Sequence, residues 1–282
     1  MEGYQILEYK LKPLRKYLEK NSISENDLSL IKTILQEITL LSSLMYRQRI
    51  DGFQRVTVNN WIKDVNGRVE FIKHLKNPPK ECVKKYGRAN LMNQSVLYET
   101  FDYITALSEM RPEINDTITV SYWRLKTEYD LCITPIFKNS TKDGVVHNEL
   151  SLRAQILSNK MINQYDDDTK KQIQIILQFI ADAFSKEVQD NNHYDYFLSS
   201  HYANRLLYEF ENGEIDAILY PSVRQSLTLS NIALKEEIFE KYFEIEKVEE
   251  SKITSKPTIG KNGWFMEGTG YSNKFENGKI IW

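Results

Sequence analysis

The clearest pattern of secondary structure lies in residues 95–124, SVLYETFDYITALSEMRPEINDTITVSYWR. The apolar run Val96 to Tyr98 is typical of a buried strand, and in Thr117 to Arg124 apolar side chains alternate with threonine and serine. Between them, Tyr103 to Glu109 is long enough for a short helix. We therefore expect a strand, a helix and a second strand in this stretch.

Residues 1 to about 50 are expected to be helical. Ser24 to Asp27 resembles a capping box at a helix start. Behind it, apolar residues recur at steps of three and four, which places them on one helical face: Leu28, Ile31, Leu35, Ile38, Leu41 and Met45. This stripe is expected to pack on the protein's own core, and a partner or dimer interface is the alternative.

The rest of the chain mixes both kinds of element. Helices are expected over residues 149–163, 168–184 and 196–210, and strands over 215–220 and 232–234. After about Ser251 the chain is rich in glycine but keeps aromatic residues, so we expect a tail that folds back on the body. The mixture predicts an α+β fold. Its parts would be an N-terminal helical extension over 1–52, a main domain over 53–250 and the tail over 251–282.

Composition excludes several classes of function. The 282 residues hold 37 Lys+Arg against 39 Asp+Glu, which gives a formal charge of -2 and no field to recruit nucleic acid. Cys82 and Cys132 form no CxxC pair, so a zinc ribbon or disulfide framework is not expected. The four histidines lack metal-ligand spacing, so no metal site is expected. No apolar run approaches the length of a membrane span or signal peptide, and we expect a cytoplasmic protein.

Polar residues that could carry chemistry occur in two blocks. The first begins with Gly87-Arg88-Ala89-Asn90 and continues to Tyr98, ten positions after Arg88, and to Glu109, which is 21 positions after it. The second is Tyr220-Pro221-Ser222, followed by Asn231. The sequence contains no GxGxxG, P-loop, GxSxG, HExxH or EF-hand motif, so these blocks are the main candidates for a site.

In order and spacing, the blocks resemble the RES family, named for Arg, Glu and Ser. Its members degrade NAD or transfer ADP-ribose, as toxins of bacterial toxin–antitoxin pairs. An arginine near the start of the family domain corresponds best to Arg55, and the resemblance runs from about Phe53 to Leu234. It implies an ADP-ribosyltransferase-like core, with a central mixed β-sheet flanked by helices.

The resemblance also implies roles for six residues. Arg88, Glu109 and Ser222 would be catalytic, and Arg55, Tyr98 and Asn231 would bind the substrate. Guanidinium groups bind a pyrophosphate in bidentate fashion, which suits both arginines. A carboxylate at Glu109 could stabilise the positive charge that spreads over the ribose as the glycosidic bond breaks. Each of these roles has a purely structural alternative. Arg88 and Glu109 could form an ion pair, Tyr98 could pack in the core, and Ser222 could only shape a turn.

The implied function is cleavage of the nicotinamide–ribose bond by an NAD glycohydrolase or phosphorylase, acting as a toxin or defence effector. NAD would be the substrate, and no cofactor would be needed. The partners would be a cognate antitoxin or immunity protein and a second copy of the chain in a homodimer. Binding to nucleic acid or to a membrane is not expected. A protein ADP-ribosyltransferase is the first alternative. The second is an inert interaction module on a RES scaffold that uses the stripe from Leu28 to Met45.

Overall fold

A computed structural model describes most of the chain: residues 2–19, 22–38, 43–63, 65, 67–137, 149–189, 191–223, 230–256 and 263–282. Its contacts group the chain into two compact units. The first unit comprises Met1–Arg47, Lys80–Gln94 and Cys132–Leu229, and the second comprises Gln48–Pro79, Ser95–Leu131 and Ser230–Trp282. Each unit is therefore built from three separate segments of the sequence. Among the described residues, no helix has the length and apolarity that crossing a membrane requires.

Helices dominate the first unit. They are α1 (Gly3–Glu19), α2 (Asp27–Gln36), α4 (Glu149–Ile162), α5 (Asp167–Ser185) and α6 (Phe197–Asn204), and α6 continues as a π-helical turn over Arg205–Glu209. Two strands, β5 (Asp130–Pro135) and β6 (Ala217–Pro221), pair in parallel. Short 3-10 turns cover Lys80–Cys82, His193–Tyr196 and Phe210–Gly213. The helices expected over 149–163, 168–184 and 196–210 are confirmed.

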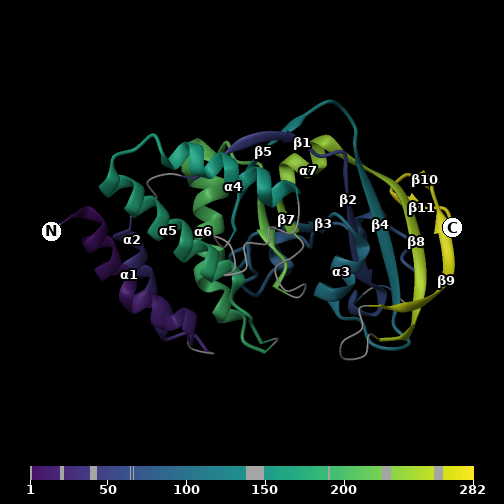
Figure 1. Cartoon of the computed structure of the whole chain (residues 1–282). Coiled ribbons are helices and arrows are strands. Elements are labelled where there is room, and N and C mark those ends of the chain that lie inside the picture. The colour runs from purple at the N-terminus through teal and green to yellow at the C-terminus, as the bar shows by residue number, and fades with distance from the viewer. Residues whose placement is uncertain are drawn as a thin grey trace. The chain divides into compact units, whose positions relative to one another are not determined.

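Helix α5 is central to the first unit (Figure 1). Asp166 caps it by accepting hydrogen bonds from the backbone of Asp168 and Thr169, both at 3.0 Å. One face is buried because its apolar residues recur at helical spacing: Ile173, Ile176, Phe179, Ile180 and Phe184. The start of α1 lies alongside α5, where the amides of Gly3 and Tyr4 donate to Asp168 at 3.2 and 3.1 Å.

The apolar stripe of α2 packs inside the first unit. Leu28, Ile31, Leu35 and Ile38 are buried, which confirms packing on the protein's own core. Leu41 lies outside the described residues. The expectation of helix up to residue 50 is wrong at its end, because α2 stops at Gln36 and Tyr46–Arg49 form strand β1. Along β1 half-buried and exposed residues alternate, which is the period of a strand.

An antiparallel sheet forms the second unit. Its strand order is β7 (Ser230–Lys235), β3 (Val96–Thr100), β2 (Gly52–Val58), β4 (Thr117–Leu125), β8 (Phe243–Ser255) and β9 (Phe265–Ser272). Helices α3 (Tyr103–Met110) and α7 (Glu236–Tyr242) pack on it, with 3-10 turns at Asn59–Trp61 and Ile72–Leu75. A small hairpin pairs β10 (Phe275–Glu276) with β11 (Lys279–Ile280). The chain is therefore α+β, with parallel and antiparallel strands flanked by helices.

The sheet of the second unit has two different faces. On one face α3 buries Ala106 and Leu107 against Val56, Val58, Ile118 and Val120. On the other face α7 places Phe239 against Trp123, with ring centroids 4.7 Å apart, and Phe53 lies 4.7 Å from Phe243. Because successive side chains of a strand point to opposite faces, the register of each strand tells which residues share a face. We call the two faces of this sheet the α3 face and the α7 face, after the helix that packs on each.

The C-terminal segment is part of this sheet. Strand β8 runs through Ser251, where the tail was expected to begin, and β9 pairs with β8 from Val248 opposite Ser272 to Ser255 opposite Phe265. The indole of Trp282 donates to the carbonyl of Val69 at 2.8 Å. The C-terminal segment was expected to fold back on the body, and it does so by pairing β9 with β8. The two strands lie side by side in Figure 1.

Candidate functional site

The six predicted site residues divide between the two units. Arg88 and Ser222 belong to the first unit, while Arg55, Tyr98, Glu109 and Asn231 belong to the second. Two contacts join the four residues of the second unit into pairs.

Glu109 and Asn231 contact each other on the α3 face. Glu109 lies in the last turn of α3, and Asn231 lies in β7 opposite Thr100 of β3. The Asn231 amide donates from Nδ2 to Glu109 Oε1 at 2.9 Å, across 122 positions of sequence. Asn231 is only 5% exposed, and its Oδ1 has no hydrogen-bond partner in the described part of the chain. The Asn231 side chain thus fixes one oxygen of the Glu109 carboxylate and keeps an acceptor for another group.

Helix α3 is fixed at its start by Asp102. The Asp102 carboxylate accepts from the Thr105 amide at 2.8 Å and from the Thr105 hydroxyl at 2.7 Å. An aspartate at this position satisfies an amide that the first helical turn leaves unpaired. Arg111 ends the helix in the left-handed conformation, with φ of 48°. The cap and the end of α3 together set the place of Glu109.

We expect Asp102→Ala to lower the free energy of unfolding by about 1 kcal/mol, because it removes the helix cap. Urea denaturation followed by circular dichroism measures this change. Asp102→Asn keeps a side-chain acceptor, so its free energy of unfolding should fall by only a small part of that amount. Equal losses for the two variants would contradict the capping role.

Arg55 and Tyr98 form the second contact. The Arg55 guanidinium donates from Nη1 to the backbone oxygen of Tyr98 at 2.6 Å. In the described residues β2 and β3 pair at Gln54 and Thr100, so Arg55 adds a cross-strand hydrogen bond beside that pair. The register places the Tyr98 side chain on the α3 face with Asn231, and Arg55 on the α7 face with Ser121. Arg55 therefore reaches the backbone of β3 from the face opposite Glu109 and Asn231.

Glu99 is a buried acid that the sequence reasoning did not select. It is 2% exposed, and neither carboxylate oxygen has a hydrogen-bond partner among the described residues. Burial raises the pKa of Glu99 to about 8, and the charge of Arg55 acts in the opposite direction. The sequence did contain a signal for this buried acid. Glu99 stands two residues after Leu97, so the alternation of the strand predicts that its side chain is buried as well.

Arg88 has a structural role in the first unit. The turn that carries it is closed by a hydrogen bond from the Gly87 amide to the Asn90 carbonyl at 3.1 Å. Arg88 Nη1 donates to the carbonyls of Phe184 and Lys186, at the C-terminal end of α5. Its guanidinium also lies 5.0 Å from the ring centre of Tyr196. A cation is favourable beside the carbonyls that end a helix, so Arg88 ties the Gly-Arg turn to α5.

Ser222 follows β6 and is fully buried. Pro221 is the last residue of that strand, so the strand expected over 215–220 is found over Ala217–Pro221. A buried hydroxyl in this position is consistent with either a site role or a turn.

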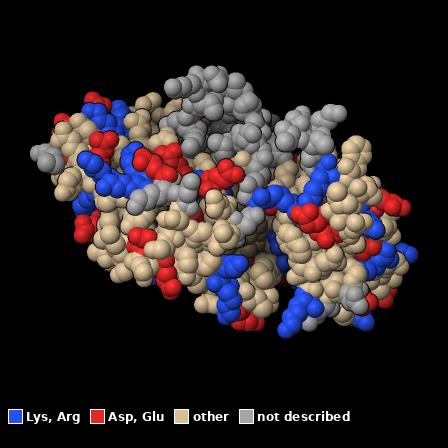
Figure 2. All heavy atoms as spheres, turned by 90° about the horizontal axis from the view of Figure 1, so that it is seen from below, with Lys and Arg blue, Asp and Glu red and all other residues tan. Residues whose placement is uncertain are grey.

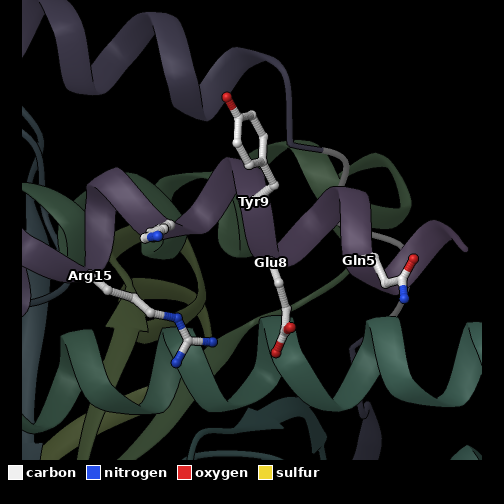
Figure 3. Close-up of a pocket in the computed structure, with 5 residues that line it drawn as sticks. Gln5, Glu8, Tyr9 and Arg15 are labelled. Carbon is white, nitrogen blue, oxygen red and sulfur yellow. The ribbon is translucent and has the colours of Figure 1, made fainter. Parts of the chain in front are cut away.

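A surface hollow occurs on α1, and none of the residues that the sequence selects lines it. It is lined by Gln5, Glu8, Tyr9, Lys12 and Arg15. Figure 3 shows that these side chains come from one helix and do not converge, since Tyr9 points away from Glu8 and Arg15. In the described ranges no group of three or more His, Cys, Asp or Glu is placed to hold a metal ion. The hollow therefore offers no chemical site comparable to the groups in the second unit.

Charges of both signs are interspersed on the face drawn in Figure 2, where neither colour forms a continuous field over the described atoms. This agrees with the balanced composition of 37 basic and 39 acidic residues. Comparisons with protein-family models, with curated proteins and with solved structures found no match.

Proposed function

We propose that this chain is a RES-like enzyme that cleaves the bond between nicotinamide and ribose in NAD. The observation that carries the proposal is the hydrogen bond from Asn231 to Glu109. The resemblance selected both residues from the sequence, and they lie 122 positions apart. Their side-chain contact supports a common site, because the resemblance selected both residues for one site before their positions in the fold were known.

In this proposal Glu109 stabilises the transition state. The bond from ribose C1′ to the nicotinamide nitrogen breaks, its electron pair leaves with neutral nicotinamide, and positive charge develops on the ribose ring. A fixed carboxylate next to that charge stabilises the transition state more than the ground state. Asn231 holds Glu109 Oε1, so the carboxylate is oriented before the substrate arrives. Water, phosphate or a protein side chain then attacks C1′, and hydrolysis releases ADP-ribose and a proton.

Of the residues selected as substrate-binding groups, only Tyr98 shares a face with Glu109 and Asn231. Arg55 lies on the opposite, α7 face of the sheet, so its role as a pyrophosphate ligand rests on the resemblance alone. The Tyr98 ring lies on the same face as Asn231 and would stack on a base of NAD. The roles of Arg88 and Ser222 rest on the resemblance alone. The exact acceptor and a biological role as a toxin or defence effector rest on it as well.

Incubating the purified chain with NAD and following nicotinamide by chromatography tests the proposal. We expect nicotinamide to appear together with ADP-ribose in buffer, or with phosphorylated ADP-ribose when phosphate is the acceptor. Nicotinamide release that requires added protein, with ADP-ribose found on that protein by mass spectrometry, would identify a protein ADP-ribosyltransferase instead. Absence of nicotinamide with water, phosphate and protein acceptors would contradict an NAD-cleaving enzyme of either kind.

The inert interaction module is less well supported. It relied on the apolar stripe of Leu28 to Met45 as an exposed contact surface. Leu28, Ile31, Leu35 and Ile38 are buried in the first unit, so these residues are not available to a partner.

A further inference from the structure

We propose that His201 makes the contact between helices α2 and α6 sensitive to acid. A proton on its imidazole adds a third positive charge beside Lys32 and Arg205, the two side chains that link α2 to α6. The inference concerns the first unit, which contains all three residues, and it does not depend on the proposed cleavage of NAD.

Two side-chain contacts join α2 to α6. The Lys32 ammonium of α2 lies 5.6 Å from the ring centre of Phe197, the first residue of α6. Arg205 follows α6, and its Nη1 donates to the carbonyl of Ile38, just beyond α2, at 2.9 Å. A cation is attracted to the face of an aromatic ring and forms a strong hydrogen bond with a carbonyl. Both contacts therefore depend on a positive charge.

His201 lies between these two contacts along α6. Residues four positions apart share one face of a helix, so Phe197, His201 and Arg205 form a row. The His201 ring centre lies 6.2 Å from that of Phe197 and 5.7 Å from that of Tyr202. Its Nε2 is buried and has no hydrogen-bond partner among the described residues. A neutral imidazole packs well in such a place, whereas a charged one loses its hydration without a hydrogen bond in return.

The charges that act on His201 have the same sign. Burial is the main cause that lowers the pKa of His201 to about 4, and the positive charges of Arg205 and Lys32 act in the same direction. Across the described chain, the other titratable groups of the elements around α6 have no resolved effect on this pKa: Asp27, Glu37, Tyr86, Asp182, His193, Tyr194, Asp195, Tyr196, Tyr202 and Glu209. A proton on His201 is therefore not compensated by a nearby acid.

The direction of the pH effect follows from these values. A histidine in an unfolded chain titrates near pH 6.5, so between about pH 6.5 and pH 4 the unfolded chain binds a proton that the folded chain does not. The stability that depends on a neutral His201 is complete above about pH 6.5 and is lost as pH falls toward 4. Lys32 is exposed, so it can move into water when the ring becomes charged. We therefore expect acid to weaken the docking of α2.

Urea denaturation of the full chain at pH 7.5 and pH 5, followed by circular dichroism, tests the inference. Between these pH values the unfolding equilibrium constant should rise about 25-fold more in wild type than in His201→Gln, which cannot take up the proton. Hydrogen exchange then locates the effect. The protection factors of the α2 amides should fall more in wild type than in His201→Gln over the same change of pH.

Two lysine variants form a matched pair. Lys32→Gln removes one of the two cations beside His201, so the loss of stability at pH 5 should become smaller than in wild type. Lys171→Gln is the control, because Lys171 is also exposed and lies 4.5 Å from the ring centre of Tyr4, but has no resolved effect on His201. It should keep the pH dependence of wild type.

Equal pH dependence in wild type and His201→Gln would overturn the inference, and so would equal effects of Lys32→Gln and Lys171→Gln. If His201→Gln does not fold, the proton NMR signal of the wild-type His201 ring gives a second test. Its midpoint should lie near pH 4 in the folded chain and should rise in Lys32→Gln. A wild-type midpoint at about 6.5, the value of an unperturbed histidine, would contradict the inference.

Discussion

Replacing Asp195 by alanine is expected to lower the free energy of unfolding by about 3–5 kcal/mol, because it leaves a buried ammonium without its counter-charge. Lys186 Nζ donates to Asp195 Oδ1 at 2.9 Å, and the two side chains are 6% and 1% exposed. Asp195 Oδ1 also accepts from the Ile23 amide at 2.7 Å. The Lys186 ammonium makes a further hydrogen bond to the Tyr17 carbonyl at 2.8 Å. The substitution therefore removes the acceptor of two buried donors at once.

Urea denaturation at neutral pH measures this loss. The control is Glu244→Ala, which breaks the exposed pair with Arg124, where the two atoms are 2.8 Å apart but the side chains are 58% and 43% exposed. An exposed ion pair contributes roughly 0–1 kcal/mol, so the control should change stability little. A loss below about 1 kcal/mol for Asp195→Ala would show that the buried pair is not a stabilising link.

The same pair supports the Gly-Arg turn. Lys186 directs its side chain to Asp195 and its backbone carbonyl to Arg88, so it connects the two contacts. Loss of Asp195 would release the Lys186 side chain and loosen the segment that holds the Arg88 guanidinium. If Arg88 has the site role that the RES resemblance implies, stability and activity will be coupled through Lys186.

Elements with a strong local pattern were predictable from the sequence. The strands around Val96 and Thr117 and the helix between them occur nearly as expected, because apolar periodicity determines which face each can bury. Strand β8 was missed because charged residues interrupt the apolar pattern of its sequence, FEIEKVEESKITS. Its buried positions include Glu250, which Arg68, Asn59 and Thr269 satisfy from other segments. No local pattern can reveal partners so far away along the chain.

For the candidate site, the resemblance selected Glu109 and Asn231 from the order and spacing of the blocks, and the structure places these two side chains in contact. The placement of Arg55 on the α7 face depends on the strand register, which a single sequence does not specify. Glu99 was missed for a similar reason, since its burial and its lack of partners are properties of the assembled sheet.

On the proposed function, Glu109→Gln is expected to lower kcat/KM for NAD cleavage by about 10²–10³, which corresponds to roughly 3–4 kcal/mol of transition-state stabilisation. Glutamine keeps a side-chain oxygen that can accept the hydrogen bond from Asn231, so the local structure should be retained. What is lost is the negative charge next to the developing positive charge on the ribose. The loss should therefore appear mainly in kcat, with a smaller change in KM. Initial rates of nicotinamide release across NAD concentrations separate the two constants.

Two further variants show whether the loss arises from this site. Glu113→Gln removes an acid that is 75% exposed, just beyond the end of α3, and should keep wild-type kinetics. Asn231→Ala keeps the Glu109 charge but removes the donor that orients it, so kcat should fall by an intermediate amount, about tenfold. If Glu109→Gln stays within threefold of an active wild type, Glu109 is not the charge-stabilising group. The Glu109–Asn231 contact would then be only a link between α3 and β7.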